Sequence, residues 1–123
     1  MKITTFNPLV VSDKADEIVA LFEELGFELR HAPMVDEETA ADQDFRLKDA
    51  NGFYVDVAQY TGIPQDMTMI RMNVSDFDEV YETLTKRGFK NTRGDGTVNT
   101  ATSKAATMVA PSGMTIALVE HLK

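Results

Sequence analysis

Residues 11–27, with the sequence VSDKADEIVALFEELGF, recur further along the chain as VSDFDEVYETLTKRGF at residues 74–89. The shared Val-Ser-Asp triplets are offset by 74 − 11 = 63 positions, and the shared Gly-Phe pairs by 88 − 26 = 62. A third pair of similar segments, GFYVDV at residues 52–57 and GMTIAL at residues 113–118, is offset by 113 − 52 = 61. Only two copies of such a long period fit in the chain, which indicates a duplicated module rather than a repeat array.

The length of 123 residues predicts a single domain over residues 1–123, built from repeat halves at about residues 1–62 and 63–123. A half of this size alone buries too little surface to be comfortably stable. We therefore expect the two halves to share a core or to pair with another copy of the chain.

The chain carries 12 basic and 20 acidic residues, which give a formal net charge of −8. Nucleic-acid binding needs a positive surface, so nucleic acid is not an expected partner. The absence of cysteine excludes disulfides and thiolate metal sites. No apolar run approaches the length of a membrane span, and residues 1–5 lack the apolar stretch of a signal peptide. We expect a cytoplasmic protein with no membrane partner.

Each copy predicts one helix between an aspartate N-cap and a glycine stop. The cap and stop are Asp13 and Gly26 in the first copy, and Asp76 and Gly88 in the second. Apolar residues between them recur at i, i+3, i+4 and i+7, the spacing of one helical face. These residues are Ile18, Leu21, Phe22 and Leu25 in the first helix and Phe77, Val80, Tyr81 and Leu84 in the second.

A strand precedes each helix, and three strands follow it, so each module is predicted to be βαβββ. The chain is expected to be an α+β protein of two tandem modules, each a curved mixed sheet with one helix packed on it. Residues 33–43 and 94–104 are predicted as loops, the first of them mobile. The predicted strands after the helices are Phe27–Pro33, Asp44–Asp49 and Phe53–Tyr60, then Phe89–Arg93, Ala105–Ala110 and Met114–His121.

This element order, the repeated Val-Ser-Asp helix entry and the segment APSGMTI at residues 110–116 resemble the vicinal oxygen chelate superfamily. That superfamily includes glyoxalase I, bleomycin-resistance proteins and extradiol dioxygenases. The resemblance implies that the two modules pair within one chain or exchange across a dimer. We expect a homodimer, because an open concave sheet leaves apolar surface to be covered.

In metal-using members of that superfamily, four strand positions bind a divalent ion. The resemblance carries these positions onto Phe6, Asp56, Met69 and Ala117. Only Asp56 offers a hard oxygen ligand, while Phe6 and Ala117 have no donor and the Met69 thioether is a poor ligand for such ions. We therefore expect no catalytic metal and no cofactor.

Strand alternation predicts which side chains line the concave pocket. If Phe6 faces the pocket, Pro8 and Val10 share its side, while Leu9 and Val11 face the helix. The same alternation predicts which side chains face the pocket in the strands that contain Asp56, Met69 and Ala117. The predicted ligand-binding residues are Phe6, Tyr54, Asp56, Met69, Arg71, Asn73 and Ala117.

An apolar pocket with a few polar groups is typical of a small-molecule site. The leading hypothesis is a metal-independent protein that binds a partly apolar small molecule, similar to the drug-sequestering branch of the superfamily. One alternative is a metal-free lyase or isomerase with Asp56 as general base and Arg71 stabilising an oxyanion. Another is a structural dimeric module with an inert cavity, in which Asp56 and Arg71 pair with each other. His31 and His121 are interpreted as ordinary surface histidines.

Overall fold

The computed structural model describes residues 2–35, 43–94, 97–99 and 103–122. The chain divides into two compact units, one made of Met1–Phe6 with Met69–Lys123 (unit 1) and one of Asn7–Thr68 (unit 2). Strand β1 (Ile3–Ser12) contributes its first residues to unit 1 and the rest to unit 2. That the whole chain acts as one domain stays a prediction.

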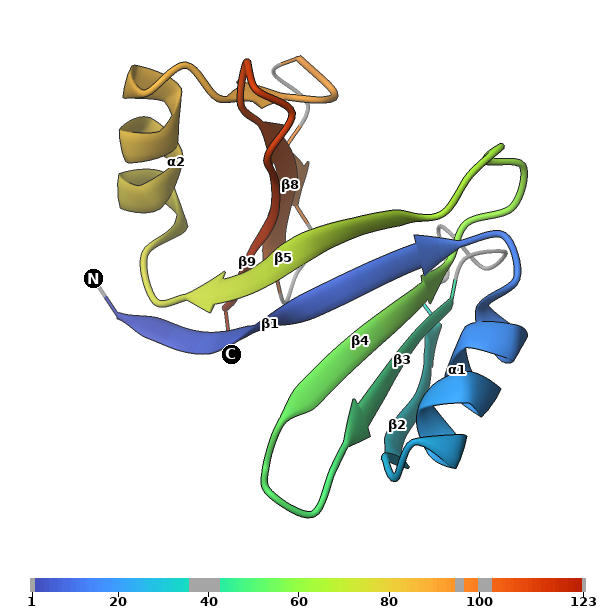
Figure 1. Cartoon of the computed structure of the whole chain (residues 1–123). Helices are drawn as coiled ribbons and strands as arrows, with labels where there is room; N and C mark the ends of the chain where they lie inside the picture. Colours follow the sequence, from blue (N-terminus) through green and yellow to red (C-terminus); the bar gives the residue numbers. More distant parts are fainter. Residues whose placement is uncertain (1, 36–42, 95–96, 100–102, 123) are drawn as a thin grey trace. The chain divides into compact units, whose positions relative to one another are not determined.

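Unit 2 contains the rest of β1 followed by one helix and three strands (Figure 1). Its strands lie in the order β2-β3-β4-β1, with β1 parallel to β4 and the other neighbours antiparallel. Helix α1 lies along one face of β2, β3 and β4. The elements are α1 (Ala15–Glu24), β2 (Glu28–Val35), β3 (Gln43–Lys48) and β4 (Tyr54–Gln59).

Unit 1 repeats this plan, with strand order β5-β9-β8-β6 and β5 parallel to β9. The short strand β7 pairs with β8 inside the segment that the sequence predicts as a loop, because Val98 and Asn99 pair with Ala105 and Lys104. The prediction of two βαβββ modules, each with one helix, is confirmed. The elements are β5 (Met67–Val74), α2 (Phe77–Lys86), β6 (Lys90–Asn91), β7 (Val98–Asn99), β8 (Ser103–Val109) and β9 (Thr115–His121).

The other predicted loop is shorter than expected, because β2 continues to Val35 and β3 begins at Gln43, and these two residues pair. Residues 36–42, on which the predicted mobile loop falls, lie outside the described residues. The bounds of the remaining strands differ from the prediction by a few residues, as is usual for strand ends.

Helix α1 packs on its sheet with a different face from the predicted one. Leu21 and Leu25 are 48% and 65% exposed. The buried face also has i, i+3, i+4, i+7 spacing, so the sequence offers two overlapping apolar stripes and tertiary packing selects one. The selected stripe, which packs with buried Leu47, Val55 and Val57, consists of Ala15, Ile18, Val19 and Phe22.

Helix α2 packs with the predicted face. Phe77 and Val80 are buried in a core with strands β8 and β9, and Tyr81 and Leu84 pack against that core. The Phe77 and Tyr81 rings are stacked, with centroids 5.6 Å apart. The prediction for this helix is therefore confirmed.

The two helices begin differently. Asp76 is the N-cap of α2, because its carboxylate accepts a hydrogen bond from the Glu79 N–H at 3.1 Å. The predicted cap Asp13 is wrong, since the N-cap of α1 is Lys14, without a side-chain cap. Gly26 and Gly88 follow the helices with φ of +108° and +93°, the left-handed conformation that glycine tolerates at a helix end.

A side chain from the last strand of each module also binds the first N–H of the helix. Gln59 Oε1 accepts from the Ala15 N–H at 2.9 Å in unit 2, and Glu120 Oε1 accepts from the Phe77 N–H at 2.8 Å in unit 1. Gln59 and Glu120 are offset by 120 − 59 = 61, the offset of the third repeated segment. The duplication therefore extends to the contact that ties each helix to its sheet.

Candidate ligand-binding face of unit 2

Strands β3 and β4 place a row of polar side chains on the face of the unit 2 sheet opposite α1. Their antiparallel register pairs Arg46 with Asp56 and Lys48 with Tyr54. The alternate residues Leu47, Val55 and Val57 face the helix, so the predicted alternation in β4 is confirmed. We call this surface the polar face. It comprises Asn7, Asp44, Arg46, Lys48, Tyr54 and Asp56.

The centre of the polar face is a bidentate ion pair. Arg46 donates from Nε to Asp56 Oδ1 at 2.8 Å and from Nη2 to Asp56 Oδ2 at 2.9 Å. The same Nη2 lies 3.4 Å from Asn7 Oδ1. Asp56 is only 2% exposed, so the carboxylate is removed from water while both of its oxygens accept strong charge-assisted hydrogen bonds.

The ion pair keeps Arg46 charged. The hydrogen bond to Asp56 raises the pKa of Arg46 above its usual value, with partial burial opposing and the nearby charges of Asp56 and Asp44 adding to it. A group whose pKa rises on folding stabilises the folded state at pH values below the pKa that the group has in the unfolded chain. Arg46 is therefore a permanent cation at every pH at which proteins are normally handled.

Tyr54 has two cations near its ring. The Arg46 guanidinium carbon lies 5.1 Å from the ring centroid and Lys48 Nζ lies 5.3 Å from it. Cation–π attraction at such distances is worth about 0.5–1 kcal/mol at exposed sites and more where water is excluded. The three side chains therefore restrain one another and give the polar face a fixed aromatic surface.

The prediction for β1 is wrong about which side of the strand faces the polar row. The parallel register pairs Leu9 with Asp56 and Val10 with Val57, and Val10 packs with the core under α1. Because side chains alternate along a strand, a one-residue difference in register moves every side chain to the other face. Asn7, Leu9 and Val11 therefore share the side of Asp56.

Phe6 and Pro8 occur in the alternate row with Val10 and are exposed, Phe6 to 61%. The corresponding register in unit 1 pairs Asn73 with Val119. If unit 2 had the same register, the repeat offsets would pair Val10 with Ala58. Val10 pairs instead with Val57, one residue earlier. The residue that meets the Arg46–Asp56 pair is consequently Asn7 rather than the predicted Phe6.

Unit 1 holds the remaining predicted site residues, and its register confirms their shared row. Arg71 pairs with Ala117, while Ile116 and Leu118 lie in the core under α2. Asn73 is 7% exposed, and its buried Oδ1 has no hydrogen-bond partner within the described part of the chain. Met69 and Ala117 are buried. That these residues bind a ligand stays a prediction.

Metal ligands are scarce in the described residues. Within residues 2–35, 43–94, 97–99 and 103–122, no group of three or more His, Asp or Glu side chains is arranged to hold a metal ion. Asp56, the one oxygen donor among the four inherited positions, is engaged by Arg46. The expectation of a metal-independent protein stays a prediction.

The ligand-binding residues predicted from the sequence do not include Asn7, Arg46 and Lys48. The strand QDFRLK at residues 43–48 alternates polar and apolar residues, and this pattern would have placed Arg46 and Lys48 on one face. The partner of Arg46 depends on the β3–β4 register, and the position of Asn7 depends on the β1 register. Neither register follows from the alternation alone.

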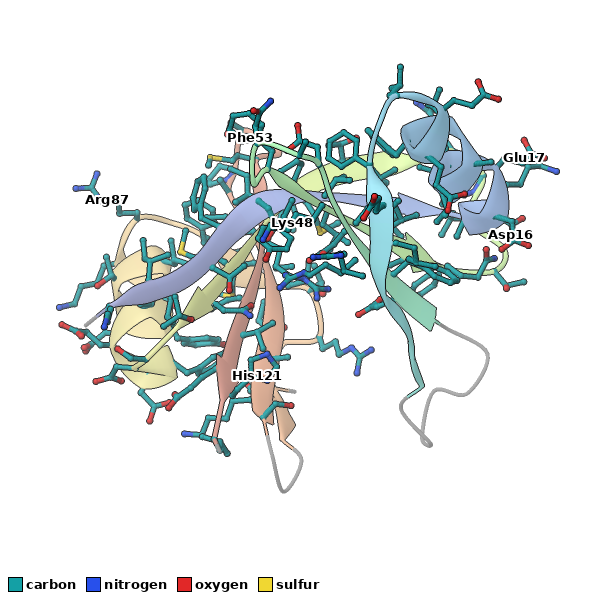
Figure 2. The ribbon with its side chains drawn as sticks, turned by 90° about the horizontal axis from the view of Figure 1, so that it is seen from below. Asp16, Glu17, Lys48, Phe53, Arg87 and His121 are labelled. Carbon is teal, nitrogen blue, oxygen red and sulfur yellow. The ribbon has the colours of Figure 1, made fainter. Side chains whose placement is uncertain are left out.

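Several other surfaces carry no predicted role. His121 is exposed at the end of β9, as expected, whereas the side chain of His31 lies outside the described part. A shallow hollow at the C-terminal end of α2 is lined by Thr83, Lys86 and the C-cap residue Arg87. Figure 2 shows Asp16 and Glu17 projecting outward from α1, whereas Lys48 lies among other side chains.

No helix in the described residues is long and apolar enough to cross a membrane.

Solved structures with this arrangement cover nearly the whole chain. A variant of methylmalonyl-CoA epimerase from Streptomyces coelicolor, in complex with 2-nitronate-propionyl-CoA, is 17% identical with a TM-score of 0.66, over 97% of this chain and 98% of its own. A glyoxalase/bleomycin resistance protein/dioxygenase superfamily member from Vibrio splendidus 12B01 is 14% identical with a TM-score of 0.62, over 97% and 99%. The chain has the fold of this superfamily.

A hypothetical protein from Bacillus halodurans C-125 shares the same fold, with a TM-score of 0.69 at 10% identity over 98% of this chain and 95% of its own. No protein-family model and no curated protein matches the chain. The resemblance to the vicinal oxygen chelate superfamily is therefore confirmed as a likeness of fold. Because one fold hosts many chemistries, function must be argued from the residues of the site.

Proposed function

We propose that this protein binds a small, partly apolar molecule on the polar face of unit 2, without a metal ion. The observation that carries the proposal is the buried bidentate pair of Arg46 and Asp56 beside the Tyr54 ring. Sites of this kind combine apolar surface with a few fixed polar groups that orient the ligand.

The polar face supports binding because its groups are held in place before a ligand arrives. Arg46 is fixed by Asp56 and Asn7, and Tyr54 is flanked by Arg46 and Lys48. Binding costs less when the side chains that contact a ligand are already ordered. Leu9 and Val11 lie on the same side of the sheet but are buried, so the apolar contact for a ligand comes from the partly exposed Tyr54 ring.

The same geometry argues against Asp56 as a general base. Both of its oxygens already accept hydrogen bonds from Arg46, so proton abstraction would have to compete with a charge-assisted bidentate pair. A general base also has to reach the proton that it removes, and Asp56 is 2% exposed. Binding is therefore favoured over the lyase or isomerase with Asp56 and Arg71.

The likeness to methylmalonyl-CoA epimerase is the observation that favours the enzyme alternative. The likeness is one of fold, at 17% identity, and carries no catalytic residue onto this chain. The structural alternative, a module with an inert cavity, predicts that no ligand binds. The three hypotheses therefore differ in what a ligand screen and an Asp56 variant should show.

The test is a thermal-shift screen of metal-depleted protein against neutral, cationic and anionic aromatic molecules. A ligand of the native state raises the melting temperature by mass action. Tyr54→Leu should weaken the binding of each hit at least tenfold. A chelator should leave the affinity of the unsubstituted protein unchanged. Turnover of a hit that Asp56→Asn abolishes would instead establish the enzyme, and a complete absence of hits would favour the inert module.

Arg30 provides a matched control for this experiment. It also pairs with a carboxylate in unit 2, Glu28 at 3.5 Å, but both side chains are more than half exposed. Arg30→Met should leave ligand affinity unchanged, whereas Arg46→Met should weaken it. Equal effects of the two substitutions would remove the polar face as the binding surface.

A further inference from the structure

The charges on the polar face are unevenly distributed along β3. Arg46 and Asp56 neutralise each other as an ion pair. Lys48 is half-buried. Glu28 is directly opposite it in the β2–β3 register but pairs with Arg30 at 3.5 Å, and no acidic side chain of the described residues forms an ion pair with Lys48. Asp44 lies on the other side of Arg46, two residues further from Lys48 along the strand. The Tyr54 end of the polar face therefore carries one unbalanced positive charge.

Arg46 adds further donors at the same end. Its Nε and Nη2 are used by Asp56 and Asn7, and the described contacts leave the two N–H groups of Nη1 available. A guanidinium presents its donors in a rigid planar fork, whereas an ammonium is a compact charge on a flexible stem. Together they offer directional hydrogen bonds and a net positive charge.

Tyr54 holds these two groups near each other. Both cations lie within 5.3 Å of the centroid of its ring, and Lys48 is directly opposite Tyr54 in the β3–β4 register. An anion that meets both donors would therefore lie next to an aromatic surface. This combination suits a molecule with a flat apolar part and an acidic group.

We propose that the ligand is an organic acid whose carboxylate is bound by Lys48 Nζ and Arg46 Nη1, with its apolar part against Tyr54. This inference rests on the proposed function and names the class of ligand. One unbalanced charge matches a monoanionic carboxylate better than a phosphate dianion, which would leave excess negative charge in a half-buried site. Lys48 is then the residue that selects acids over neutral molecules.

The test compares an acid with its neutral isostere. Naphthalene-2-carboxylate and naphthalene-2-carboxamide have the same flat ring system, and titration calorimetry measures their affinities for the metal-depleted protein. The acid is expected to bind at least tenfold more tightly in low salt, with a smaller preference in 0.5 M NaCl because salt screens the attraction. Lys48→Met should reduce the preference to near unity, and Lys48→Arg should retain most of it.

Lys14→Met serves as the matched control, since Lys14 is an exposed lysine of the same unit, and it should leave the preference unchanged. Circular dichroism of each variant verifies that the fold is intact. Equal affinity for the acid and the amide would overturn the inference while leaving the proposed function intact. Failure of both molecules and of every other aromatic probe to bind would overturn the proposed function and this inference together.

Discussion

Arg46 and Asp56 face each other across β3 and β4, joined by two hydrogen bonds of 2.8 and 2.9 Å. Removal of one partner of a buried ion pair is strongly destabilising, because the charge that remains buried loses its charge-assisted hydrogen bonds. Arg46→Met should therefore lower the free energy of unfolding by about 3 kcal/mol, measured by urea denaturation at neutral pH.

The double variant Arg46→Met with Asp56→Leu removes the charge as well as its partner. It should recover at least half of the stability lost in the single variant, because replacement of a buried pair by apolar residues is often nearly neutral. The exposed Arg30→Met control should change stability by less than about 0.5 kcal/mol. A double variant no more stable than the single one would show that Asp56 is not buried as the structure describes.

Two equivalent aspartates of the repeat are predicted to differ in their effect on stability. Asp76→Ala removes the hydrogen bond to the Glu79 N–H and should cost about 1 kcal/mol. Asp13→Ala should cost less than about 0.5 kcal/mol, because Asp13 does not cap α1. Equal losses in thermal or urea unfolding would mean that the two helices begin alike.

The buried face of α1 can be tested in the same manner. Leu47→Ala empties a fully buried position under the helix and should cost about 2–5 kcal/mol. Leu25→Ala removes a side chain that is 65% exposed and should cost less than about 1 kcal/mol. A large loss of stability in Leu25→Ala in monomeric protein would instead indicate that the face with Leu21 and Leu25 is the buried one.

Oligomeric state is an independent prediction from the sequence. We expect a homodimer, so sedimentation equilibrium at micromolar concentration should give twice the chain mass. Leu21 of α1 and the C-cap residue Leu25 are exposed apolar side chains one turn apart. A monomer across the whole concentration range would show that the apolar surface is tolerated without a partner.

The modular order could be predicted from the sequence because it depends on local signals. The repeated segments at residues 11–27 and 74–89 predict the positions of both helices, as the structure has them. The glycine stops at Gly26 and Gly88 require a backbone conformation that few other residues adopt. These signals do not depend on tertiary packing, so they hold in both copies.

Part of the candidate site could not be predicted, because it depends on strand register. Tyr54 and Asp56 follow from alternation within β4, which the structure confirms. Asn7 takes the place expected for Phe6, since β1 and β4 pair one residue away from the register of the equivalent strands in unit 1. That difference arises from packing between strands distant in sequence, and no local pattern reports it.

The choice between the two stripes of α1 has the same origin. The predicted stripe includes Leu21 and Leu25, and the observed one includes Ala15 and Val19. Both stripes contain Ile18 and Phe22, so periodicity alone favours neither. The Gln59 side chain holds the Ala15 N–H at the start of the helix, and this long-range contact is consistent with the observed orientation.

The most direct test of metal-free binding on the polar face is a heteronuclear NMR titration. The protein is dialysed against a chelator and titrated with naphthalene-2-carboxylate or the best screening hit. Saturable shifts are expected at Asn7, Arg46, Lys48 and Tyr54, while the exposed helix residues Asp16 and Glu17 should be unperturbed. Shifts that appear only after a divalent metal is added, or saturable binding that leaves the polar face unperturbed, would contradict metal-free binding on this face.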